Sequence, residues 1–114
     1  MYEYKGVLDR IVDGDTIDVI VDVGFKMTTN QRIRLARIDT PEIYRVPQDS
    51  EEYSKGMKSK EYVEKRMAEN GGKFLIRTSK LTGKYGRYIG EIFFEDSDIS
   101  LNDELLQQGL ATKA

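Results

Sequence analysis

The sequence of 114 residues contains no cysteine, no histidine and no tryptophan, and it has only two prolines. Without cysteine, no disulfide can stabilise the fold, and cysteine usage says nothing about the redox compartment. Without cysteine and histidine, the chain cannot build a zinc site of the usual kind or a Ser-His-Asp or Cys-His nucleophile. Any catalysis must therefore come from Asp, Glu, Lys, Arg, Tyr, Ser or Thr, and a metal would be a hard cation bound through oxygen ligands.

Long apolar runs are also missing. No run approaches the roughly 18 residues that a membrane span needs, so no membrane contact is expected. Apolar residues make up 39% and charged residues 33%, which indicates a globular protein with a single domain over residues 1–114. No signal peptide begins the sequence, which predicts a cytoplasmic protein if the chain is complete and a secreted one if it is a processed form. A monomer is expected.

The formal net charge is −2, but the charges are unevenly distributed. Between residues 73 and 90 every charged side chain is a cation, whereas residues 91–104 carry only acids. A cationic run of this kind is ordinarily a solvated face, and taken alone it favours that interpretation over nucleic acid binding.

Alternating apolar residues predict five strands, and a 3.6-residue periodicity predicts two helices. The expected strands cover residues 4–12, 16–23, 31–38, 73–79 and 88–94. One helix is expected within 52–70, stopped by Asn70-Gly71-Gly72, with Gly56 moving its start a few residues later. The other helix follows Ser100 as N-cap and ends at Gly109. This order predicts an α+β, mostly β protein, a five-stranded Greek-key barrel of the OB type with two helices.

Three short segments hold the residues suited to chemistry, and each also has a plain structural interpretation. Asp13-Gly14-Asp15-Thr16 has the Asp-Gly signal of a hairpin turn. The stretch from Arg34 to Glu42 ends in Asp-Thr-Pro-Glu, which can simply leave a strand, because proline keeps the residue before it extended. Thr82–Arg87 contains two glycines that indicate a hairpin. However, an arginine interrupts the apolar strand of the second segment, and the cations flanking Tyr85 could hold a phosphate while the ring stacks on a base.

Together and in this order, the three segments closely resemble staphylococcal nuclease, and the similarity runs from about Ile11 to Leu110. The resemblance implies a calcium-dependent nuclease that hydrolyses phosphodiester bonds of DNA and RNA. It further implies cleavage at the bond to the 5′ oxygen, which leaves a 3′-phosphate. Single-stranded substrates are expected to be preferred, because a flat barrel face and Tyr85 suit unstacked bases.

The resemblance also implies a role for each acid. Asp15 and Asp39 would be the carboxylate ligands of the calcium ion, helped by the backbone carbonyl of Thr40. Glu42 would be the general base, or at least the group that orients the attacking water. Such a set fits calcium, which prefers hard oxygen ligands and here would keep positions for water and for a phosphate oxygen.

The basic residues have implied roles as well. Arg34 and Arg87 would grip the scissile phosphate and stabilise its pentacoordinate transition state, and Lys84 and Tyr85 would contact the nucleotide. A planar guanidinium that stays protonated matches the charged equatorial oxygens of phosphorus better than lysine does. The best-known members of the family continue with nucleotide-packing tyrosines and a third helix, whereas this sequence stops at Ala114.

The main alternative is a catalytically weak nucleic-acid-binding module of the OB type, because some domains of this kind have lost their catalytic residues. All the implied acids and both arginines are present here, and acids beside a phosphate site would repel the ligand in the absence of a metal. This argument favours the enzyme. A calcium-sensing domain lacks support, since nothing resembles the acidic twelve-residue loop of such proteins.

Overall fold

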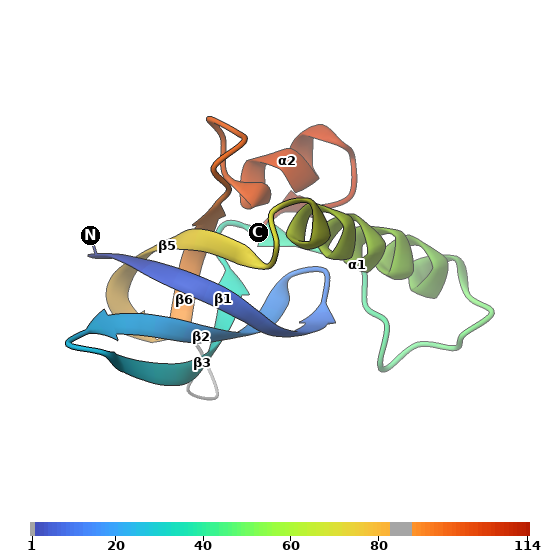
Figure 1. Cartoon of the computed structure of the whole chain (residues 1–114). Helices are drawn as coiled ribbons and strands as arrows, with labels where there is room; N and C mark the ends of the chain where they lie inside the picture. The colour runs from blue at the N-terminus through green and yellow to red at the C-terminus, as the bar shows by residue number, and fades with distance from the viewer. Residues whose placement is uncertain (1, 83–87) are drawn as a thin grey trace.

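A computed structural model describes residues 2–82 and 88–114 of the chain, with the backbone alone at 79–82. Five strands form a closed barrel in the order β1-β2-β3-β6-β5 (Figure 1). These strands are β1 (Tyr2–Asp13), β2 (Thr16–Gly24), β3 (Met27–Leu35), β5 (Lys73–Thr82) and β6 (Tyr88–Phe93). All neighbouring pairs are antiparallel except β3 and β6, which are parallel. The barrel and its two helices confirm the predicted fold class.

The two helices are α1 (Glu51–Glu69) and α2 (Leu101–Gln107). The prediction that α1 starts late because of Gly56 was wrong, since the Ser50 side chain accepts a hydrogen bond from the Tyr53 amide at 3.2 Å and caps the helix before Glu51. Both helices end as predicted, each with a glycine at positive φ just past its cap: Gly71 at 64° and Gly109 at 71°. Neither helix is long and apolar enough to cross a membrane.

The third strand lies earlier than predicted, at Met27–Leu35 instead of residues 31–38. It ends at Leu35 because the chain turns at Arg37, whose φ is 70°. The next two residues form β4 (Ile38–Asp39), which pairs with β7 (Thr112–Lys113) outside the barrel. The early end of β3 therefore directs the Asp39 segment away from the barrel wall and toward the C-terminal segment.

The core fills the barrel and continues under both helices. Ile17 and Val19 of β2 are fully buried, as the predicted alternation requires, although Val23 on the same face is exposed near the end of the strand. α1 contributes Val63 and Met67, and α2 contributes two buried leucines, Leu101 and Leu105. Because α1 packs beside the β1–β2 turn (Figure 1), the turn and the segment after β4 are held between the barrel and this helix.

Candidate functional site

Asp15 lies in the turn between β1 and β2, and most of its side chain is buried. Its carboxylate accepts a hydrogen bond from the Thr40 amide at 3.0 Å and another from the Thr16 hydroxyl at 3.1 Å. The Asp15 amide in turn donates to the Asp13 carboxyl at 3.0 Å. The turn therefore fixes one carboxylate against a segment 25 residues further along the chain.

The pKa values of the two acids of this turn are shifted in opposite directions. Burial, together with the hydrogen bond and the charge of Asp15, raises the pKa of Asp13 well above its ordinary value. Burial also opposes ionisation of Asp15, but hydrogen bonds from Asp13 and the Thr40 amide, and the charge of Arg34, hold the pKa of Asp15 below its ordinary value. Asp15 is thus the more acidic member of the pair.

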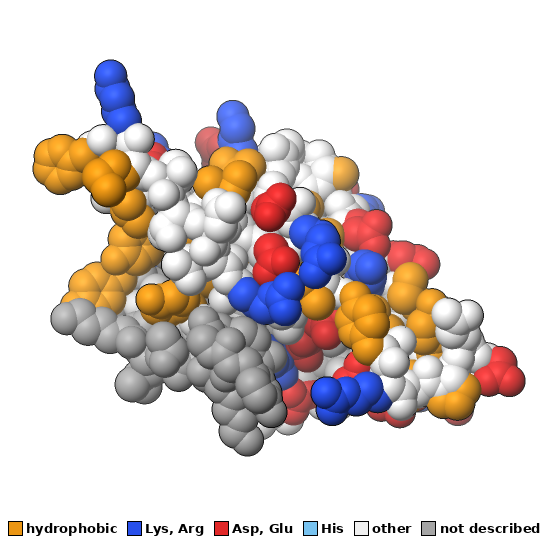
Figure 2. Space-filling model, turned by 90° about the horizontal axis from the view of Figure 1, so that it is seen from below, with side chains coloured by type: hydrophobic (Ala, Val, Ile, Leu, Met, Phe, Trp, Pro, Cys, Tyr) orange, Lys and Arg blue, Asp and Glu red, His pale blue; other side chains and the backbone are white. Residues whose placement is uncertain are grey.

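Arg34 lies between two of the predicted metal ligands. One of its terminal nitrogens, Nη2, donates to the Asp39 carboxylate and lies 3.3 Å from Asp15 Oδ2, while Nη1 donates to the Leu35 carbonyl at 2.9 Å. The arginine side chain is only 19% exposed. Two carboxylates that share one nitrogen atom must lie close to each other. On the face of the molecule in Figure 2, Lys and Arg side chains adjoin Asp and Glu side chains near the centre.

Close packing of backbone segments sets the position of Asp39, Thr40 and the residues that follow. A Cβ atom at Gly14 would lie 3.0 Å from the Thr40 side chain and 2.8 Å from Ser59 of α1. A Cβ atom at Gly56, also in α1, would lie 2.6 Å from the Pro41 carbonyl oxygen. Because Gly14 and Gly56 lack side chains, the turn, the Thr40–Pro41 segment and α1 can pack in direct contact.

Glu42 projects from the same segment and is exposed. Its carboxylate accepts hydrogen bonds from the amides of Ile43 and Tyr44, at 3.1 and 2.9 Å. The Tyr44 hydroxyl donates to the carbonyl of Val12, just before the β1–β2 turn. Glu42 is therefore held by its own backbone next to the turn that carries Asp15, two residues beyond Thr40.

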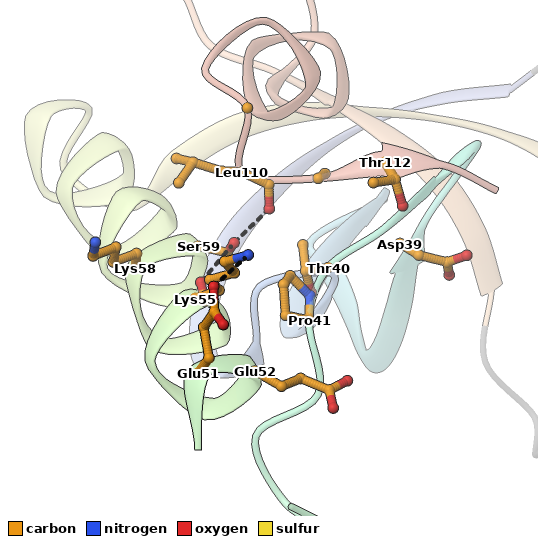
Figure 3. A pocket seen from close by; sticks show the side chains of 12 residues that line it. Asp39, Thr40, Pro41, Glu51, Glu52, Lys55, Lys58, Ser59, Leu110 and Thr112 are labelled. Carbon is orange, nitrogen blue, oxygen red and sulfur yellow. Dashed lines mark hydrogen bonds and ion pairs between the residues drawn. The ribbon is translucent and has the colours of Figure 1, made fainter. Parts of the chain in front are cut away.

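A cleft of about 840 Å³ borders the site on the side of α1 (Figure 3). Its walls are the Asp39–Pro41 segment, the first half of α1 and residues 109–112. Ser59 joins two of these walls through a hydrogen bond from its hydroxyl to the Leu110 carbonyl. In Figure 3 the Asp39 carboxylate points away from α1, so Asp39 forms the rim of the cleft and not its floor.

Residues 32–114 match the family described as staphylococcal nuclease homologue. The chain belongs to this family. It is 34% identical over 113 residues to endonuclease YhcR of Bacillus subtilis, covering 96% of this chain but 9% of that protein. It is 33% identical over 126 residues to an uncharacterized protein of Methanocaldococcus jannaschii, covering 95% of this chain and 58% of that protein. The chain thus spans only part of the curated relatives that it matches.

For the predicted site of this nuclease homologue, the structure brings Asp15, Arg34, Asp39 and Thr40 into direct contact and places Glu42 beside them. The other predicted residues, Lys84, Tyr85 and Arg87, lie outside the described residues. The residue that follows them, Tyr88, begins β6 and pairs with Ile33 next to Arg34.

Sequence reasoning missed two residues that position the site of this family member. Gly56 was interpreted only as a helix-weakening residue; a glycine inside a helical pattern is also the signal of a close contact. The other is Asn102 of α2, which is completely buried and donates to the carbonyls of Ala36 and Gly90, at 2.9 and 3.2 Å. Asn102 fixes the turn after Arg34 against β6, and no local sequence signal indicated this role.

Proposed function

We propose that the chain is a calcium-dependent nuclease that hydrolyses phosphodiester bonds of DNA and RNA. The family supports a nuclease-type function, and one of its relatives is named an endonuclease. The single observation that supports the proposal is the contact of Arg34 with both Asp15 and Asp39. A guanidinium is a group that can bind phosphate, and two adjacent carboxylates are groups that can bind a hard cation.

The residues present fit a calcium ion. Among the described residues no three acidic side chains are grouped as a metal site. The donor set that we propose is therefore smaller, with two carboxylates, Asp15 and Asp39, which both contact Arg34, and the backbone carbonyl of Thr40. The Thr40 amide is already bonded to Asp15, which keeps the backbone of residue 40 next to that carboxylate. When bound, calcium would act as a Lewis acid on a phosphate oxygen.

The remaining steps fall to side chains of the chain. Glu42, held by two backbone amides, takes a proton from the attacking water as it adds to phosphorus. Arg34 and Arg87 bind the equatorial oxygens, on which negative charge grows, and stabilise the pentacoordinate transition state. The bond from phosphorus to the 5′ oxygen then breaks, the 5′ oxygen takes up a proton from solvent water and leaves as a hydroxyl, and the other product keeps a 3′-phosphate. Lys84 and Tyr85 contact the nucleotide, and single-stranded substrates are preferred because their bases can unstack.

The test is cleavage of single-stranded DNA by the purified chain, with calcium or with a chelator. Glu42→Gln is compared with Glu64→Gln, which removes an exposed acid of α1. We expect cleavage with calcium only, products with a phosphatase-sensitive 3′ end, and a loss of about 100-fold or more in kcat for Glu42→Gln alone. Cleavage in the presence of the chelator would contradict the requirement for a metal ion. Strong activity of Glu42→Gln would contradict the role of Glu42 as general base. A folded chain that binds DNA without cleaving it would be the binding module.

A further inference from the structure

A second cleft, of about 340 Å³, opens at the mouth of the barrel where β1 begins and β2 ends. The start of β1 lies at the end of the barrel away from α1 (Figure 1). Three aromatic rings line the cleft, those of Tyr2, Tyr4 and Tyr88. Two polar side chains of β3, Thr29 and Gln31, add a hydroxyl and an amide. The described residues that line this cleft carry no charge.

One residue that lines this barrel-mouth cleft, Ile33, is the chain neighbour of Arg34 in the candidate active site. Tyr88 pairs with Ile33, another lining residue, and the next pair along the same two strands is Ile89 with Arg34. Side chains alternate along a strand, so Arg34 and Ile33 lie on opposite faces of β3. In the described residues β6 pairs with β3 only over Ile33–Leu35. A nucleic acid strand that reaches from Arg34 to the cleft would therefore have to cross only this short pairing of β3 and β6.

The chemistry of the lining fits a nucleobase better than an alkyl chain or a phosphate. Tyrosine rings provide stacking surfaces that accept any base. The Gln31 amide donates to the Thr29 hydroxyl at 3.0 Å, and these two groups together offer donors and acceptors to the edge of a base. An alkyl chain would use none of their remaining donors and acceptors. Figure 2 shows hydrophobic side chains gathered beside the charged centre of the face.

We propose that the barrel-mouth cleft binds an unpaired base of the substrate strand next to the scissile phosphate. This inference rests on the proposed nuclease function. Single-stranded sites on OB folds extend over about 4 to 16 nucleotides, well beyond the one phosphate held at Arg34. The cleft would give the enzyme its preference for single strands, because a base paired in a duplex cannot enter it.

The test uses oligothymidylates in which one position at a time lacks its base. With the unaltered chain, we expect the loss of one base near the cleavage point to lower kcat/KM about tenfold. Tyr88→Leu should lower kcat/KM about tenfold on the intact oligonucleotide and should then be insensitive to the missing base. Tyr2→Leu, at a more exposed position, gives the same test if Tyr88→Leu does not fold. The control is Tyr53→Leu in α1, which should keep the response of the unaltered chain.

The proposed role of the cleft in base binding would be refuted if both tyrosine variants, like the Tyr53→Leu control, kept the full response to the missing base. Equilibrium binding of a fluorescent oligothymidylate, measured in a chelator, separates this failure from failure of the nuclease. Binding that weakens in the Tyr88→Leu and Tyr2→Leu chains supports the cleft even if no cleavage occurs. Binding that is equal in all variants refutes it, and absence of both binding and cleavage refutes both proposals.

Discussion

The carboxylate of Asp15 accepts a hydrogen bond from the amide of Thr40 at 3.0 Å, and this bond joins the β1–β2 turn to the segment after β4. The two residues are also proposed neighbours in the calcium site. An asparagine at position 15 could keep the bond through its side-chain carbonyl but would lack the negative charge. The fold and the metal site can therefore be separated experimentally at this position.

Asp15→Asn should leave the chain folded and lower its calcium affinity by about tenfold or more, since affinity depends on the number of charged ligands. Isothermal titration with calcium measures the effect. Asp22→Asn is the matched control, because Asp22 also accepts a backbone hydrogen bond, from Gly24 at 2.8 Å, but lies far along the exposed hairpin. Equal calcium binding by the Asp15→Asn chain and the control would exclude Asp15 as a ligand.

Arg34→Lys should keep the charge at the site but lower kcat by about 100-fold or more, because an ammonium group cannot present the planar pair of donors that the phosphate oxygens require. Substrate affinity should change less. Arg32→Lys, two residues away on the same strand, is the control; Arg32 binds Asp18 in an exposed ion pair at 2.7 Å. Retention of kcat in Arg34→Lys would mean that this arginine supplies only positive charge.

Gly56→Ala should destabilise the chain, although alanine is the better helix former by about 1 kcal/mol. The new Cβ would lie 2.6 Å from the Pro41 carbonyl oxygen and 2.4 Å from the Ile43 side chain, so α1 and the segment that bears Glu42 must move apart. We expect a loss of about 1–3 kcal/mol in the free energy of unfolding and a fall in kcat. Urea unfolding beside Ser54→Ala, an exposed position in the same helix, measures the difference. Stability that rises in both variants would contradict the close contact.

The fold was predictable because its strands are half-buried and alternate in polarity, and its helices carry clear stop signals. Ile17 and Val19 on one face of β2, and Asn70-Gly71-Gly72 after α1, are local signals that the structure follows. The early end of β3 was not predictable, because the turn that follows it, at Arg37, is held by Asn102, a residue more than 60 positions away that donates to the carbonyl of Ala36. A strand boundary set by such a distant hydrogen bond leaves no trace in the local pattern.

For the site, the resemblance carried by the three motifs implied roles for Asp15, Arg34 and Asp39. The structure places these three side chains in contact, and their roles stay predictions. The sequence did not predict that one nitrogen of Arg34 would lie between both acids. Nor did it predict the role of Gly56, since what a missing side chain allows depends on the segment packed against it. Close approach of backbones is a tertiary property that residue types alone do not fix.

Arg66 of α1 holds the two helices together and gives the sharpest prediction on stability. It lies 2.8 Å from the Glu104 carboxylate in α2 and 2.6 Å from Asp96, and its side chain is 12% exposed. The guanidinium also stacks 4.9 Å from the centre of the Phe94 ring. Hydrogen bonds to Asp96 and Glu104 raise the pKa of Arg66. This arginine therefore stays charged and compensates the buried carboxylate of Glu104.

Arg66→Met should lower the free energy of unfolding by about 3–5 kcal/mol, because it leaves the Glu104 carboxylate buried without its partner. Lys65→Met, an exposed neighbour, should change it little. Adding Glu104→Gln to Arg66→Met should restore part of the loss, since the amide carries no charge to bury and can still accept a hydrogen bond from Tyr62, now 2.9 Å from Glu104. Chemical unfolding of the unaltered chain, Arg66→Met, Glu104→Gln and the double variant forms a double-mutant cycle and gives the coupling energy. If Glu104→Gln brought no recovery, the cost of Arg66→Met would come from lost packing against Phe94 and not from an unpaired charge.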